Sequence, residues 1–159
     1  DAIQQIPEAK TLINNILKEG PVHIIADNTH VSDAFGAHWD PIHRVITIAK
    51  NSKMSKGAII GSLLFEPHNA AVDSKFYQLD KLAMERKISR TRYIESMEYL
   101  EYLNSHNAAK IAEIGIRMGL LPKDSRLPTY PSFKEHYYMQ QISGHSNCFS
   151  QNYDMLQNM

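Results

Sequence analysis

Residues 57–76 read GAIIGSLLFEPHNAAVDSKF and form the longest apolar run of this 159-residue chain. Glu66 lies in the middle of the run, directly after Leu63, Leu64 and Phe65. A carboxylate among apolar neighbours must be hydrogen-bonded, paired or shifted in pKa, and such a placement is typical of functional sites. We therefore take Glu66 as the first candidate catalytic residue. The alternative is a capped or paired glutamate with a structural role.

The same run predicts a helix from about residue 56 to about residue 86, with Ser52 or Ser55 as its N-cap. Pro67 interrupts this pattern, because proline removes one backbone hydrogen bond and clashes with the carbonyl group of Leu63. We therefore expect a kink or a break close to Glu66. The alternative is that Pro67 begins a second helix.

Upstream of this helix, residues 1–20 are predicted to be helical because apolar side chains recur at steps of three and four. Short strands are predicted at residues 22–26, 34–40 and 43–50, with a loop at residues 28–32. The strand at 34–40 ends before Pro41 and is expected at the edge of the sheet. The strand at 43–50 is apolar on both faces, which predicts burial on two sides.

Downstream, residues 89–119 give the clearest helical pattern, with Gly119 as C-cap. A proline-rich connection at 120–131 leads to a short aromatic helix at 131–143. The fold class is therefore predicted to be α+β: a small N-terminal sheet of two or three strands packed on a mostly helical body with a central long helix hairpin. Residues 1–143 are expected to form a single globular domain.

Residues 144–159 are polar and show weak periodicity, so they predict a C-terminal tail that is partly ordered by docking. Cutting the chain after Gly144 is then expected to cost about 1 kcal/mol or less. The chain begins at Asp1 without a methionine, as expected of an excerpt or a processed product.

Composition limits the classes of function. The formal net charge is zero, so binding of nucleic acid or an anionic membrane through a whole-protein field is not expected. The single cysteine, Cys148, excludes an intrachain disulfide and a cysteine-based zinc site. No apolar run has the length that a bilayer requires. We expect a soluble protein with a protein substrate or protein partner and no cofactor; the oligomeric state is left open.

Two further carboxylates are candidate catalytic residues. Glu95 and Glu98 lie three positions apart, so they are neighbours on the surface of the long helix. If the central helices pack as a hairpin, Glu66 could meet one of them. Two carboxylates in one cleft can share a proton, perform acid–base chemistry or hold a divalent cation. The alternative is that both are solvated and pair with Arg92 or Tyr102.

The chain has eight histidines, but none form an H-x-x-x-H pair on a predicted helix. The closest cluster is His38, Asp40 and His43, which could converge at a turn between two strands and hold a metal. We assign Asp40 and His43, together with His68, to substrate binding.

Cys148 could act as a nucleophile with His136 or His145 as its base. A catalytic thiol needs a positioned base and usually a helix N-terminus. Neither is evident in the polar tail, so a non-catalytic thiol is favoured.

Two strands followed by a helix bearing LLFEPHNA (residues 63–70) resemble the core of a zincin metallopeptidase, most closely the compact peptidase domains of bacterial secreted effectors and toxins. The resemblance covers roughly residues 22–103. That family carries His-Glu-x-x-His followed by alanine on this helix, and a later glutamate as third zinc ligand. Here Phe65 replaces the first histidine and Asn69 the second, so Glu66 and Ala70 alone carry over, and no zinc is predicted on this helix.

The resemblance implies a degenerate zincin-like scaffold in which Glu66 is the general base or acid. Asn69 would orient the substrate or a water molecule, and Glu95 or Glu98 would be the partner of Glu66. The first functional hypothesis is thus a bacterial effector or toxin-like domain, hydrolytic if active, that is secreted into a host or target cell cytoplasm.

The second hypothesis is a non-catalytic protein–protein interaction module with a tyrosine-rich helical surface, because tyrosines are enriched at interfaces. Its candidate residues are Tyr93, Tyr99, Tyr102, Phe133, Tyr137 and Tyr138, for which packing in the core is the alternative. Glu66 in an open cleft beside a second polar group would favour the enzyme. Glu66 sealed in the core would favour the module.

Overall fold

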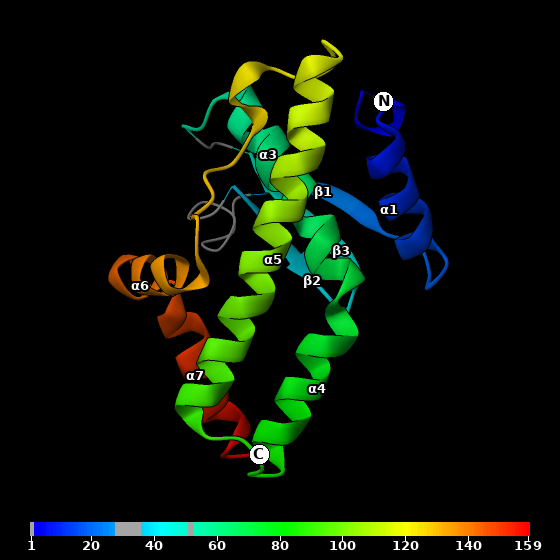
Figure 1. Cartoon of the computed structure of the whole chain (residues 1–159). Coiled ribbons are helices and arrows are strands. Elements are labelled where there is room, and N and C mark those ends of the chain that lie inside the picture. The colour runs from blue at the N-terminus through cyan, green and yellow to red at the C-terminus, as the bar shows by residue number, and fades with distance from the viewer. Residues whose placement is uncertain (1, 28–35, 51–52) are drawn as a thin grey trace. The chain divides into compact units, whose positions relative to one another are not determined.

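The computed structural model describes residues 2–27, 36–50 and 53–159 (Figure 1). Its elements are η1 (Ile3–Gln5), α1 (Pro7–Leu17), β1 (His23–Asp27), β2 (Ala37–Asp40), β3 (Val45–Ala49), α3 (Lys56–Ala71), α4 (Asp73–Met84), α5 (Arg90–Arg117), η2 (Lys123–Ser125), α6 (Phe133–Ser143) and α7 (Ser146–Leu156). In this part of the chain an N-terminal three-stranded sheet accompanies six α-helices, which confirms the α+β prediction.

The chain divides into two compact units. The first unit comprises Asp1–Ala71 and Asn104–Pro128, and the second comprises Val72–Leu103 and Thr129–Met159. The long helix α5 therefore contributes its C-terminal part to the first unit and its N-terminal part to the second. The predicted tail, residues 144–159, belongs to the second unit.

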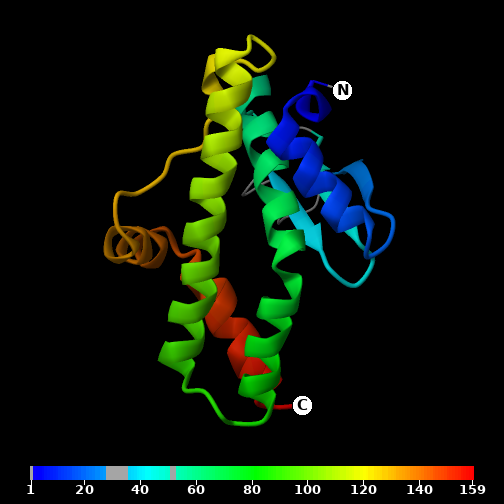
Figure 2. The same ribbon diagram turned by 45° about the vertical axis from the view of Figure 1, so that its right-hand side comes forward.

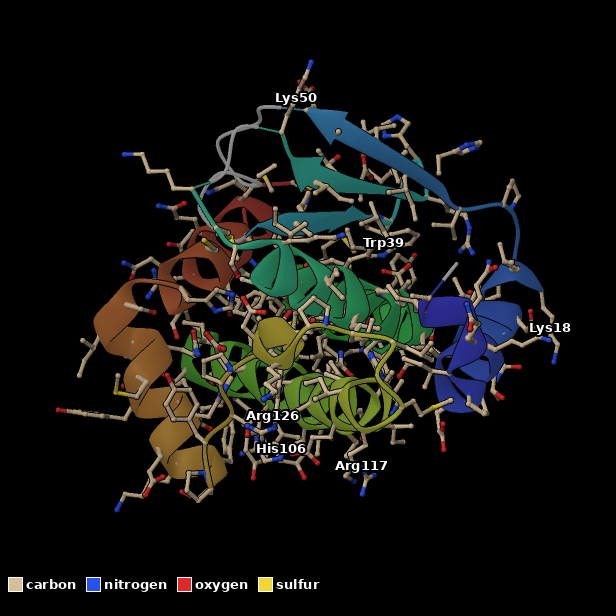
Figure 3. All side chains as sticks on the ribbon, turned by 90° about the horizontal axis from the view of Figure 1, so that it is seen from above. Lys18, Trp39, Lys50, His106, Arg117 and Arg126 are labelled. Carbon is tan, nitrogen blue, oxygen red and sulfur yellow. The ribbon has the colours of Figure 1, made fainter. Side chains whose placement is uncertain are left out.

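The sheet of the first unit has the order β1-β3-β2, with β3 parallel to β1 and antiparallel to β2. The central strand β3 is buried at Ile46, Thr47 and Ala49, and β2 lies at an edge, as predicted. Trp39 on β2 packs with Ile16 of α1 and Ala70 of α3 (Figure 3). The other edge strand, β1, is exposed along its whole length. The predicted loop at 28–32, and the predicted strand residues 34–35, lie outside the described residues.

Helix α3 begins where the sequence predicts. Ser55 Oγ accepts a hydrogen bond from the backbone N–H of Ala58 at 3.1 Å, which makes Ser55 the N-cap; the alternative cap, Ser52, lies outside the described residues. The predicted break near Glu66 is wrong, because α3 continues through Pro67 to Ala71, and the alternative kink there stays a prediction. The break comes at Val72, and α4 follows. Leu64 and Ala70 are buried on either side of the proline, so packing outweighs the lost hydrogen bond.

In the second unit, α4 and the N-terminal part of α5 form a hairpin around a buried cluster of Ala83, Tyr93, Ile94 and Met97. Three α7 side chains, Phe149, Tyr153 and Leu156, pack against this cluster, and Figure 2 shows α7 beside α4 and α5. Residues 146–156 are thus a docked helix; docking of this segment was expected from the sequence, but the helix was not. Positions 149, 153 and 156 are four and three apart, the spacing of one helical face.

The end of α5 matches the prediction, because Gly119 has a φ of 72° and closes the helix in the left-handed conformation that glycine adopts without strain. None of the helices in the described part of the chain is both long and apolar enough to cross a lipid bilayer.

Candidate functional site

Glu98 lies on α5 in the second unit and has no solvent-exposed surface. Its Oε1 atom accepts hydrogen bonds from Ser146 Oγ at 2.7 Å and from His145 Nδ1 at 3.0 Å. His136 Nε2 lies 3.4 Å from Glu98 Oε2, within the distance of an ion pair but without hydrogen-bond geometry. Glu98 was predicted as a catalytic candidate, and the alternative of a solvated Glu98 is wrong.

Local structure explains how these groups reach Glu98. Ser132 caps α6 by accepting a hydrogen bond from the N–H of Glu135 at 3.3 Å, which places His136 in the first turn. Gly144 ends α6 with a φ of 83°, and this left-handed residue turns the chain so that His145 and Ser146 begin α7. Aromatic rings surround His136: the Tyr102 and Tyr130 ring centroids lie 5.6 and 5.7 Å from its own.

The environment keeps Glu98 ionised. Burial alone raises the pKa of this carboxyl group. The contacts of His136, His145 and Ser146, and the charge of His145, outweigh burial and lower the pKa of Glu98 to about 2. Glu98 is therefore a carboxylate at neutral pH.

The carboxylate also fixes the state of His145. An ionised carboxylate only accepts hydrogen bonds, so Nδ1 of His145 must carry the proton in this contact. Nε2, the second ring nitrogen, is then the one whose protonation can change while this contact is kept. The His145 side chain is 21% exposed whereas that of Glu98 is 0% exposed. The imidazole thus links a buried negative charge to the surface of the second unit.

Sequence reasoning named His136 and His145 only as possible bases for Cys148, and it did not name Ser146. The apolar spacing of Phe149, Tyr153 and Leu156 was the available signal, because it predicts a helix that begins just after Gly144. Cys148 lies in the first turn of that helix and is exposed. No hydrogen bond joins its thiol to His145 in the described structure, so we assign it no catalytic role.

Glu95, the other predicted catalytic residue on α5, lies nearer the surface than Glu98. Glu95 is 35% exposed and pairs with Arg92 at 3.5 Å, which is the alternative stated for it. Both line an open depression of about 510 Å³ between α4 and α5, together with Lys75, Tyr99 and Phe133. The Phe133 ring also stacks on that of His136 at 6.4 Å.

Among the predicted surface tyrosines, Tyr93 is fully buried, and its hydroxyl group donates a hydrogen bond to Asp80 at 2.6 Å. Tyr99 and Tyr138 are 46% and 61% exposed. The tyrosine-rich surface is therefore smaller than predicted.

Glu66 lies in the first unit and is 6% exposed. Its Oε2 atom accepts a hydrogen bond from Asn69 Nδ2 at 3.4 Å, and Asn69 Oδ1 accepts one from Asn104 Nδ2 at 2.9 Å. Residues three apart on one helix are neighbours, so the structure brings the two predicted residues Glu66 and Asn69 together. Glu95 and Glu98 belong to the other unit, so their predicted meeting with Glu66 stays a prediction.

His68 is 7% exposed, and its Nδ1 atom lies 2.9 Å from the carbonyl oxygen of Leu64. Burial lowers the pKa of His68, although the contact with Leu64 opposes this shift. A neutral, buried imidazole of this kind is typical of a packed core, and the predicted role of His68 in substrate binding stays a prediction.

Asp40 and His43 come together in the exposed turn after β2. Asp40 Oδ2 lies 2.7 Å from His43 Nδ1, and Asp40 Oδ1 accepts hydrogen bonds from the backbone N–H groups of Ile42 and His43. The hydrogen bond from His43 lowers the pKa of Asp40. Among the described residues, no three His, Cys, Asp or Glu side chains gather to hold a metal ion, so His38 does not complete the predicted cluster.

Comparison with protein-family models, curated proteins and solved structures finds no match to this chain. A functional assignment must therefore rest on the geometry of the residues themselves.

Proposed function

We propose that this chain is an enzyme that acts by general acid–base catalysis, with hydrolysis as its reaction class. His145 is the group that exchanges a proton with substrate or water, and Glu98 is its positioning residue. One observation carries the proposal: the fully buried Glu98 carboxylate holds His145 Nδ1 at 3.0 Å while the imidazole reaches the surface.

The proton transfers follow from this geometry. Nε2 of neutral His145 takes a proton from water as the water attacks the substrate, and the same nitrogen then gives the proton to the leaving group. Glu98 stabilises the imidazolium that forms between these steps and keeps the ring in one orientation. His136 and Ser146 supply contacts that keep Glu98 ionised while His145 is neutral.

A purely structural role explains the cluster less well. Burying a charged network carries a large desolvation cost, and well-packed apolar residues of similar volume often stabilise a core as much or more. A polar network at this position is therefore better explained by a requirement for proton transfer.

The zincin-like frame of the first unit supports a second part of the proposal. Glu66 and Asn69 adjoin each other on α3, as in the resemblance to bacterial effector and toxin peptidases. We include in the proposal that the chain acts as a toxin-like domain in a target cell. The interaction module is the second candidate function, and both the burial of Glu66, which is 6% exposed, and the exposure of Tyr99 and Tyr138 favour it.

Hydrolysis of p-nitrophenyl acetate tests the acid–base proposal, because this ester responds to any accessible catalytic imidazole. We expect saturable turnover, and a fall in kcat/KM of about 10²-fold or more in His145→Gln and in Glu98→Gln. His23→Gln, which removes an exposed histidine of the first unit, should hydrolyse the ester at the wild-type rate.

Growth inhibition on expression in bacteria and yeast, measured with the same variants, separates the two candidate functions. The enzyme is contradicted if folded His145→Gln keeps both ester hydrolysis and growth inhibition. Loss of growth inhibition in Tyr99→Ser/Tyr138→Ser, with His145→Gln unaffected, would instead support the interaction module.

A further inference from the structure

The first unit contains an apolar cavity of about 310 Å³ between α1, the sheet and α3. Its walls are aliphatic side chains such as Leu12, Ile46 and Leu63. Of the described residues that line it, Gln4 alone has a polar side chain. At the rim, Leu17 and Ile24 are 48% and 57% exposed, so apolar surface continues from the cavity to solvent.

The volume of this cavity indicates the size of its ligand. Small-molecule sites commonly start at about 300 Å³ and are lined mostly by apolar groups. An apolar cavity of about 150 Å³ binds benzene, so a cavity of twice that volume has room for roughly ten to twelve carbon atoms. The nearly complete absence of polar groups on its walls favours an unbranched hydrocarbon chain.

The charge beside the mouth of the cavity indicates which chemical group the ligand carries at the end of its hydrocarbon chain. A second hollow of about 390 Å³ shares Gln4, Ile13 and Leu17 with the cavity, and Lys10 lines it. No residue that lines either hollow is acidic. Lys10 takes part in none of the ion pairs found among the described residues. The position therefore suits a negatively charged group.

We propose that the first unit binds a medium-chain alkyl carboxylate, with its hydrocarbon chain in the apolar cavity and its carboxylate beside Lys10. Gln4, Ile13 and Leu17 line both hollows, so the two parts of the ligand would occupy adjoining hollows. This proposal is independent of the acid–base site in the second unit.

Titration calorimetry of the full chain with decanoic acid tests the proposal. We expect saturable binding of one decanoate per chain, and at least about tenfold weaker binding of hexanoate, which has four fewer methylene groups to bury. Ala70→Phe fills the cavity from α3, where Ala70 is 2% exposed, and should abolish binding. Ile13→Phe narrows the mouth at a partly exposed position and keeps the test valid if Ala70→Phe fails to fold.

Lys10→Gln tests the head group. We expect it to weaken decanoate binding about twofold to fivefold and to leave binding of uncharged decan-1-ol unchanged. Lys18→Gln is the control at the C-cap of the same helix, because Lys18 points to solvent (Figure 3), donates to Asn15 at 3.0 Å and lines neither hollow.

Three results would overturn the proposal: no saturable decanoate binding, equal effects of Lys10→Gln and Lys18→Gln, or undiminished binding to a folded cavity-filling variant. Binding to phosphatidylglycerol vesicles without binding of free decanoate would assign the site to a lipid surface instead. Self-association that Ala70→Phe abolishes, again without decanoate binding, would assign the cavity to a second copy of the chain.

Discussion

Removal of residues 145–159 is expected to unfold the second unit, with a loss of about 5 kcal/mol or more, a large part of the stability of a typical domain. The deletion removes Phe149, Tyr153 and Leu156, which pack against the buried cluster that contains Tyr93. These three side chains are partly buried, so each contributes less than the about 1.5–3 kcal/mol of a fully buried side chain, and together they account for part of the loss.

The deletion also removes polar partners. Asn152 Nδ2 donates to the Tyr93 hydroxyl at 2.6 Å and to Asp80 at 3.2 Å, and burial raises the pKa of Asp80. Without α7, Asp80 and Tyr93 lose this donor, and Glu98 loses both His145 and Ser146. A buried carboxylate with its partners removed costs several kcal/mol more, on the order of 3–5.

Urea unfolding and limited proteolysis of the truncated chain, compared with the full chain, measure this effect. A chain that ends at Asn158 is the control, because it loses only Met159, which is 88% exposed. A chain cut after Gly144 that resists protease like the full chain would show that α7 is dispensable, as the sequence alone predicts.

Glu98→Ala is expected to lower the free energy of unfolding by about 3–5 kcal/mol, since it leaves the buried donors of His145 and Ser146 without their acceptor and removes the carboxylate beside His136. Glu98→Gln keeps the shape and one acceptor oxygen, so a loss of roughly 1–2 kcal/mol is expected. Glu95→Ala on the same helix removes only a surface pair and should change stability by about 0.5 kcal/mol or less. Urea unfolding at pH 7 distinguishes the three variants.

The pH dependence of stability tests the state of Glu98. Its pKa falls from 4.5, the ordinary value, to about 2 in the folded chain. A lowered pKa means that the carboxylate stabilises the fold fully above about pH 4.5. That contribution, on the order of a few kcal/mol, is lost as pH falls from about 4.5 to about 2. Glu98→Gln should lose less stability than the wild type over this interval, and equal losses would contradict the ionised, hydrogen-bonded Glu98.

Local patterns predicted much of the fold. The central position of β3 follows from its two apolar faces, and the extent of α5 follows from its apolar stripe and from Gly119. The break after α3 was misplaced because proline propensity is a local quantity, whereas burial of Leu64 and Ala70 is a tertiary one. Helix α7 was missed because Asn, Gln and Ser residues surround its three apolar side chains and weaken the periodic signal.

The candidate site could be predicted from the sequence less completely than the fold. Spacing on one helix identifies Glu95 and Glu98 as neighbours, but it does not show which of them is buried. Burial of Glu98 depends on His136, His145 and Ser146, which approach it from 38 to 48 residues further along the chain. Such long-range contacts leave no local pattern, so sequence reasoning placed Glu66 ahead of Glu98 as a candidate.

Chemical rescue of His145→Ala by added imidazoles tests proton transfer by His145 most directly. The variant is assayed for p-nitrophenyl acetate hydrolysis with substituted imidazoles of similar size and different pKa, after subtraction of the rate with each imidazole alone. We predict restored hydrolysis whose rate increases with the pKa of the imidazole, as expected for general base catalysis, and no such gain for His23→Ala. A folded His145→Ala that is not rescued, or is rescued to the same rate by every imidazole, would contradict the central claim.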